Sequence, residues 1–258
     1  MPQIPKMLHG RRYNLAVTGI SLVEAAQLYR KVGISVIPIA AGTKVPDGEA
    51  LAATRSYVFP RRISWWLFTR RLPTDDEINT WFASGTRNLA IVSGYRQLLV
   101  LDFDDAASYE RWYAKYGSLA DKTCIQKSSR GVHVLFRWKG TWTIPFYATT
   151  KFHLLDSRGL RVGELKGDRD WVVAWPSIHP SGIQYAWLPH QAPWDKEILR
   201  IDSLHQIGVE PFRDLVGGYV RILPRLLFRP RSEVPAVMRK LESKYRALRG
   251  VRGVIHKE

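Results

Sequence analysis

The amino-acid sequence predicts an α+β fold. Short apolar runs bounded by glycine, proline or acidic residues indicate β-strands through the middle of the chain, and helix-period apolar patterns lie before, among and after them. Strands and helices do not alternate regularly, which argues against a repeating βαβ architecture. The chain has 258 residues and is 45% hydrophobic. It is therefore long enough for one large core with an appendage and too apolar to be disordered throughout.

Two helices in the first third of the chain carry their own start signals. Ser21 and Glu24 form a capping-box pattern, and Thr74 is placed to cap a second helix. Ahead of the central strands we expect, in order, a helix over 21–33, a strand over 34–39, a loop over 41–48 and a helix over 75–82. Between the loop and the second helix lies a segment, 55–71, in which arginines alternate with aromatic residues.

The middle of the chain is expected to hold most of the strands. Two apolar runs, 88–93 and 98–104, flank a turn at Gly94 and are expected to pair as a hairpin. Residues 160–165 and 171–174 are expected to form a second hairpin. The other elements expected in this region are a helix over 106–116 and strands over 123–127, 132–138 and 183–187.

The pattern changes after about residue 195, where helices are expected over 196–205 and 232–248. We therefore expect three parts: a flexible basic tail over 1–12, a main domain over 13–200, and a basic helical C-terminal segment over 201–258.

The charge balance indicates a polyanionic partner. Lys and Arg number 39 and Asp and Glu 23, a net charge of +16, and residues 221–258 alone carry 11 basic and 3 acidic side chains, or +8. Nucleic acid is the simplest such partner, and an acidic membrane surface is the other. Cys124 is the single cysteine, so neither an intrachain disulfide nor a cysteine-based structural zinc site is expected. The chain shows no signal-peptide core and no membrane-spanning apolar run, so we expect a cytoplasmic protein without a membrane partner.

Three carboxylates are candidates for a metal site. Asp102 and Asp104 stand two residues apart at the end of an apolar strand, so both face the same side. Two carboxylates this close repel unless a cation lies between them, and their hard oxygens favour Mg²⁺ or Mn²⁺. Glu164 would supply a third ligand. Alternatively, the aspartates only cap the next helix, and Glu164 is an exposed hairpin acid paired with Lys166.

Two turns are candidates for binding phosphate. The glycine-containing turn after residue 127 lets backbone N–H groups approach an anion, and a second turn over 174–182 is rigid and carries polar side chains. In each case, an ordinary structural histidine or simple turn chemistry is the alternative. The donors of the two turns are Lys127, Ser129, Arg130 and His133 in the first, and Ser177, His179 and Ser181 in the second.

The segment over 55–71 has the composition of a platform for single-stranded nucleic acid, because cations alternate with aromatic rings. A hydrophobic hairpin with solvated arginines is the alternative. The candidate DNA-binding residues are Lys44, Arg61, Arg62, Trp65, Trp66, Arg70 and Arg71.

Taken in order, these motifs resemble the prim-pol (bifunctional DNA primase/polymerase) branch of the archaeo-eukaryotic primase superfamily. The resemblance covers about residues 21–187. The motifs that carry it are Leu99-Val-Leu-Asp-Phe-Asp104, Ser129-Arg-Gly-Val-His133, Gly163-Glu-Leu-Lys166 and Trp175-Pro-Ser-Ile-His-Pro-Ser-Gly182.

The resemblance implies a primase-type catalytic core of mixed and antiparallel sheets flanked by helices, with one half like an RRM palm. It implies primer synthesis and extension on a single-stranded DNA template from NTPs or dNTPs, in the replication of a plasmid or virus, with a replicative helicase as a further partner. Two Mg²⁺ or Mn²⁺ ions would be held by Asp102, Asp104 and Glu164. The nucleotide would be bound by Lys127, Ser129, Arg130, His133, Lys166 and His179.

Two other functions fit parts of the sequence. Glu164-Leu-Lys166 matches the Glu-x-Lys element of metal-dependent DNA nucleases, with Asp102 or Asp156 as the partner acid. The chain could also be a replication-initiation module that binds DNA and has lost the chemistry.

Overall fold

The computed structural model describes residues 19–58, 62–139, 151–156, 160–211 and 221–224. The chain divides into two compact units, Met1–Ile222 and Leu223–Glu258, and the first contains nearly all of the described residues. The tail expected over 1–12 and the helix expected over 232–248 lie outside the described residues. In the part that is described, no helix combines the length and apolar character needed to cross a membrane.

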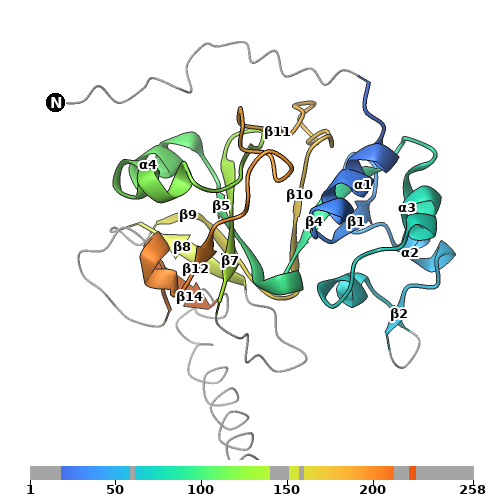
Figure 1. Cartoon of the computed structure of the whole chain (residues 1–258), viewed down its shortest axis with the longest axis horizontal. Helices are drawn as coiled ribbons and strands as arrows, with labels where there is room; N and C mark the ends of the chain where they lie inside the picture. Colours follow the sequence, from blue (N-terminus) through green and yellow to red (C-terminus); the bar gives the residue numbers. More distant parts are fainter. Residues whose placement is uncertain (1–18, 59–61, 140–150, 157–159, 212–220, 225–258) are drawn as a thin grey trace, which may run out of the picture. The chain divides into compact units, whose positions relative to one another are not determined.

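A three-stranded antiparallel sheet forms the first half of the fold, in the order β1-β4-β10. The capping box expected at Ser21 and Glu24 is present, and Thr74 caps its helix as expected and forms a further capping box with Glu77. Figure 1 shows the helices gathered beside this sheet. The elements of this half are α1 (Leu22–Lys31), β1 (Val36–Ile39), α2 (Gly48–Ala53), β2 (Tyr57–Val58), β3 (Arg62–Ile63), η1 (Trp65–Thr69), α3 (Asp75–Phe82), β4 (Asn88–Ser93) and β10 (Asp170–Val173).

A nine-stranded sheet forms the second half, in the order β11-β6-β7-β5-β9-β8-β14-β13, with β12 paired to β7. Its centre, from β6 to β8, is antiparallel throughout. Its elements and connections are η2 (Tyr95–Gln97), β5 (Leu98–Phe103), α4 (Ala106–Ala120), β6 (Ile125–Lys127), β7 (Val132–Trp138), β8 (Lys151–Leu155), β9 (Arg161–Lys166), β11 (Ala186–Trp187), β12 (Arg200–Ile201), η3 (Leu204–Ile207), β13 (Glu210–Pro211) and β14 (Arg221–Pro224).

Strand β5 separates two hydrophobic cores. Its odd-numbered residues, Leu99, Leu101 and Phe103, pack with α4 and η3 on one face of the large sheet. Leu98 and Val100 point to the other face and join the core that is built around the small sheet. Asp102 and Asp104 lie on this second face as well, after the apolar residues. The carboxylates therefore lie at the end of the strand, beside the core that the two sheets share.

The two hairpins expected from the sequence are not formed, and those predictions were wrong. β4 pairs with β1 and β10 in the small sheet, whereas β5 pairs with β7 and β9 in the large one. Likewise β9 and β10 belong to different sheets. The turn after β4 does not close a hairpin, because Gly94, Arg96 and Gln97 all have positive φ and direct the chain out of one sheet and into the other.

The helix expected over 196–205 is also absent. Ile198 packs in the core around the small sheet, whereas Ile201 and Leu204 pack in the core under α4. An extended segment can reach both cores, and β12 pairs in parallel with the end of β7. Residues 200–211 therefore continue the first compact unit beyond the boundary expected at 200. Strand β8 and helix α2 were not predicted, and the strand expected over 183–187 is reduced to β11.

Candidate active site

A row of polar side chains crosses five adjacent strands of the large sheet. In register, Gln126 of β6 pairs with His133 of β7, which pairs with Asp102 of β5. Asp102 pairs with Glu164 of β9, and Glu164 pairs with His153 of β8. Directly opposed residues in antiparallel strands point to the same face. The pairing therefore places these five side chains in one line, with two carboxylates at its centre.

The three predicted carboxylates share this face. Asp104 lies two residues beyond Asp102, and its N–H donates to the Val162 carbonyl at 3.0 Å, which continues the pairing of β5 with β9. The Glu164 side chain is 7% exposed, that of Asp102 is 23% exposed and that of Asp104 is 43% exposed. The site therefore grades from a buried glutamate to an aspartate at the surface.

Two basic side chains from β9 compensate these carboxylates. Lys166 Nζ lies 3.0 Å from Glu164 Oε2 and 3.8 Å from Asp102 Oδ2. It also lies 3.5 Å from an oxygen of Asp170, which begins β10 of the small sheet. Arg161 lies 3.0 Å from Glu164 and 3.1 Å from Asp104. Lys166 thus links the acids of the large sheet to the small sheet.

The electrostatics differ between the two aspartates. Burial raises the pKa of Asp102, but His133, Lys166 and Lys44 outweigh it and lower the pKa to about 2. Burial raises the pKa of Asp104, and the neighbouring Asp102 and Glu164 carboxylates raise it further against the opposing effect of Arg161. The repulsion expected among the acids is therefore present at Asp104, whereas Asp102 is held ionised.

The pKa of Lys166 follows from the same cluster. Burial lowers the pKa of the ammonium group, but Asp170, Asp102 and Glu164 together raise it above its ordinary value. Lys166 is therefore protonated at neutral pH, although its side chain is only 9% exposed.

Gln126 fixes the tautomer of His133. The Trp175 N–H donates to Gln126 Oε1 at 2.7 Å, so the Gln126 amide nitrogen faces His133 Nδ1 at 3.0 Å and donates to it. His133 Nδ1 is then an acceptor, and Nε2 carries the hydrogen that points to Asp102 Oδ1 at 3.3 Å. His133 therefore presents a donor toward the carboxylates.

The two predicted phosphate-binding turns meet through their side chains. Ser129 Oγ lies 2.9 Å from Ser181 Oγ, which lies 2.8 Å from His179 Nδ1. Lys44 and Arg130 are close enough to His179 to lower its pKa further, after burial has lowered it first. Residues expected from separate motifs are thus brought to one place. Ser177 instead has a structural role, because its buried hydroxyl bonds the backbone of Leu89.

Lys127 is not part of this arrangement. It pairs in register with Val132, one position from the Gln126–His133 pair, so its side chain starts on the opposite face of the sheet.

The predicted DNA-binding segment is tied to the rest of the fold by its arginines and tryptophans. Arg70 makes two hydrogen bonds of 2.9 Å to Asp168, and Arg71 is paired with Glu77 at 2.6 Å. The Trp65 ring lies 4.9 Å from the Trp171 ring of β10. The Arg169 guanidinium lies 5.1 Å from the Trp66 ring. Arg62 belongs to β3, whereas Arg61 lies outside the described residues.

The donor chemistry of the site fits a divalent cation. As the side chains stand, no three His, Cys, Asp or Glu residues in the described ranges are grouped closely enough to hold a metal ion. The three carboxylates nevertheless share one face, and burial together with the neighbouring carboxylates raises the pKa of Asp104. Hard oxygen donors that repel each other are the set that Mg²⁺ or Mn²⁺ favours.

Four residues of the site were missed by the sequence reasoning. Gln126 stands at the i−7 position from His133 and becomes its neighbour only through the β6–β7 pairing. Asp170 and Arg161 reach the carboxylates only because of the way β9 and β10 are placed, which the sequence does not indicate. His153 lies on strand β8, which was not predicted. No local signal marked Gln126, because its short strand, Ile125–Lys127, also contains a lysine.

The chain matches a protein-family model over most of its length. The model of the bifunctional DNA primase/polymerase N-terminal domain (Prim-Pol) matches residues 25–203. The matched range contains the whole row of polar residues and both turns. The comparison with curated proteins gives no match.

Proposed function

Because the chain belongs to the Prim-Pol family of bifunctional DNA primase/polymerases, we propose that it makes primers on a single-stranded DNA template and extends them with nucleoside triphosphates. The observation that carries this proposal is the register of β5 and β9, in which Asp102 lies directly opposite Glu164 and Asp104 follows on the same face. The family implies DNA and nucleotide substrates, and the site supplies acids and bases suited to both.

Asp102, Asp104 and Glu164 would hold the divalent cations. When bound, such ions activate the primer 3′-hydroxyl and neutralise the pyrophosphate that leaves. Asp102 contributes a carboxylate that is ionised at every physiological pH, since its pKa is about 2. Arg161 bridges Asp104 and Glu164 and so holds two of the three acids in place.

The basic groups around the acids would bind the triphosphate. Lys166 stays protonated and lies beside the carboxylates, and His133 presents its Nε2–H on the same face. Arg130, Ser129 and His179 extend this donor set along the two linked turns. Donors fixed before the substrate arrives stabilise developing charge without reorganisation cost.

The surplus of positive charge would hold the template, so DNA affinity is expected to fall steeply with salt. Lys44, one of the predicted DNA contacts, lies near Asp102 and His179. We propose that residues 201–258 add to DNA affinity through their basic side chains, and that replication of a plasmid or virus, with a helicase partner, is the setting.

A template-dependent incorporation assay tests the proposal. The wild-type protein with Mg²⁺ or Mn²⁺, single-stranded DNA and labelled NTPs or dNTPs should yield product with and without a supplied primer. Asp102→Ala and Asp104→Ala should reduce product to background, whereas Asp195→Ala, which removes an exposed acid elsewhere, should retain it. Extension by either active-site variant would contradict the assignment.

A metal-dependent nuclease is the second candidate. It is favoured by the 3.0 Å contact between Lys166 and Glu164, because a Glu-x-Lys pair beside an aspartate is typical of such enzymes. The same incubation without nucleotides separates the two functions. Degradation of DNA in that reaction, lost in Lys166→Ala, would favour the nuclease.

A further inference from the structure

A basic cavity lies away from the carboxylates. Its volume is about 590 Å³, and it opens beside the start of β5 and the end of β7. In the register of these strands Leu98 pairs with Arg137, whereas Asp102 pairs with His133. Four residues of extended strand separate the two places, or roughly 14 Å. The cavity is therefore distinct from the candidate active site.

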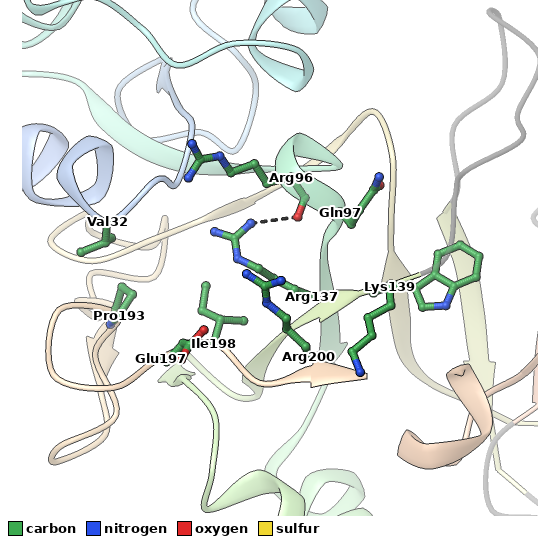
Figure 2. A pocket seen from close by; sticks show the side chains of 10 residues that line it. Val32, Arg96, Gln97, Arg137, Lys139, Pro193, Glu197, Ile198 and Arg200 are labelled. Carbon is green, nitrogen blue, oxygen red and sulfur yellow. Dashed lines mark hydrogen bonds between the residues drawn. The ribbon is translucent and has the colours of Figure 1, made fainter. Parts of the chain in front are cut away.

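Positive side chains dominate the walls of this cavity. Arg96, Arg137, Lys139 and Arg200 line it, and Glu197 is the one acid among its lining residues. Figure 2 shows the guanidinium groups of Arg137 and Arg200 next to each other, with Arg96 above them. Like charges gathered around a concave surface create a field that attracts anions.

The charge of Arg137 is not balanced by an acid in the described part of the chain. Its guanidinium donates to the carbonyl of Arg96 at 2.9 Å and of Gly33 at 3.1 Å, and among the described residues no carboxylate pairs with Arg96, Arg137 or Arg200. Burial lowers the pKa of Arg137, and Arg96 and Arg200 lower it further. An anion between these groups would relieve that repulsion.

The backbone at the rim of the cavity has an unusual conformation at Arg96 and its neighbours. Arg96 has φ 49° and Gln97 has φ 60°, values that residues other than glycine rarely adopt. Across from them, Gly33 also has positive φ, and a Cβ added there would lie 2.8 Å from Arg96 Nη1. Strained backbone that the surrounding fold maintains is typical of functional positions.

We propose that this cavity binds the polyphosphate of a nucleoside triphosphate at a second site, apart from the carboxylates. The three guanidinium groups suit phosphate oxygens, which arginine binds through paired hydrogen bonds. The volume lies within the range of roughly 300–1,000 Å³ that is usual for small-molecule pockets, whereas an extended DNA strand needs a groove. Glu197 supplies an acceptor for ribose hydroxyls.

Isothermal titration of the full chain in EDTA tests the site, with inorganic tripolyphosphate, ATP and a single-stranded oligonucleotide as separate ligands. The variant Arg96→Ala/Arg200→Ala removes two exposed guanidiniums, and Arg111→Ala/Lys122→Ala removes the same charge from exposed positions outside the cavity. We expect the cavity variant to lose one class of site for tripolyphosphate and ATP, or to bind there at least about tenfold more weakly, because it loses charge-assisted hydrogen bonds. The control variant should bind as the wild type does.

Unchanged stoichiometry and affinity in the cavity variant would overturn the proposal. So would a loss confined to the oligonucleotide, because the cavity would then bind strand phosphates. Thermal unfolding of both variants shows whether they are folded. The experiment requires no nucleotide incorporation, so a failure of the proposed primase activity would leave its result unaffected.

Discussion

The two aspartates at the end of β5 are expected to have opposite effects on stability. In metal-free protein, Asp102→Asn should destabilise the fold at neutral pH, whereas Asp104→Asn should stabilise it. The reason is that His133, Lys166 and Lys44 lower the pKa of Asp102 despite its burial, whereas burial and the neighbouring carboxylates raise the pKa of Asp104. An asparagine keeps the shape of each side chain, removes its charge and replaces one acceptor oxygen with an NH2 donor.

The magnitude for Asp102 follows from its pKa. A value of about 2 in the folded chain, against an ordinary 3.8, corresponds to about 2 kcal/mol of stability at neutral pH. Because the folded-state pKa is the lower one, this contribution is complete above about pH 4 and is lost as the pH falls toward 2. For Asp104 the raised pKa means that the ionised carboxylate opposes folding, so its removal should help.

Urea unfolding in EDTA at pH 7 measures both effects as changes in the transition midpoint. The difference between wild type and Asp102→Asn should shrink as the pH is lowered below 4, because the wild-type carboxylate becomes protonated. Equal shifts in the same direction for both variants would refute the reasoning. Excess Mg²⁺ should stabilise the wild type more than either variant, since each lacks one expected ligand.

Three other substitutions test how the site is built. Gly163→Ala should lower the melting temperature and incorporation together, because a Cβ there would lie 2.2 Å from the carbonyl oxygen of Asp102 on the paired strand. Gln126→Met should raise the KM for nucleotide, since it removes the donor to Nδ1 that fixes His133, and should also lower stability, because the buried Trp175 N–H loses its acceptor; an unchanged KM would argue against that role. Ser177→Ala should cost about 1–3 kcal/mol in urea unfolding and leave incorporation by the folded protein intact, because its buried hydroxyl bonds only backbone.

Local signals in the sequence predicted the parts of the fold that depend on neighbouring residues. The capping box at Ser21 and the N-cap at Thr74 form as expected, and the turn over 128–131 joins β6 to β7. The two-residue spacing of Asp102 and Asp104 likewise gives them one face of β5. Each of these features depends only on residues that are close together in the sequence.

Partners far apart in the sequence could not be predicted in this way. Both β4 and β5 are apolar, so periodicity alone does not tell whether they pair with each other or belong to different sheets. The positive φ values of Arg96 and Gln97 decide the matter, and neither residue type signals that conformation. The same limit hid Gln126, whose role depends on pairing with His133.

The position of the acids follows from the packing of β5, whose side chains contribute to both hydrophobic cores. Leu98 and Val100 occupy the inward positions where the small sheet covers the strand, and the next two inward positions are Asp102 and Asp104. Apolar residues there would extend the core, so the change to carboxylates ends it and opens the sheet to solvent. Lys166 then links Glu164 to Asp170 of the small sheet across this edge. At this edge the two sheets are therefore linked by charge as well as by the apolar core, and charged groups fixed in place before the substrate binds are what the transfer of a phosphoryl group requires.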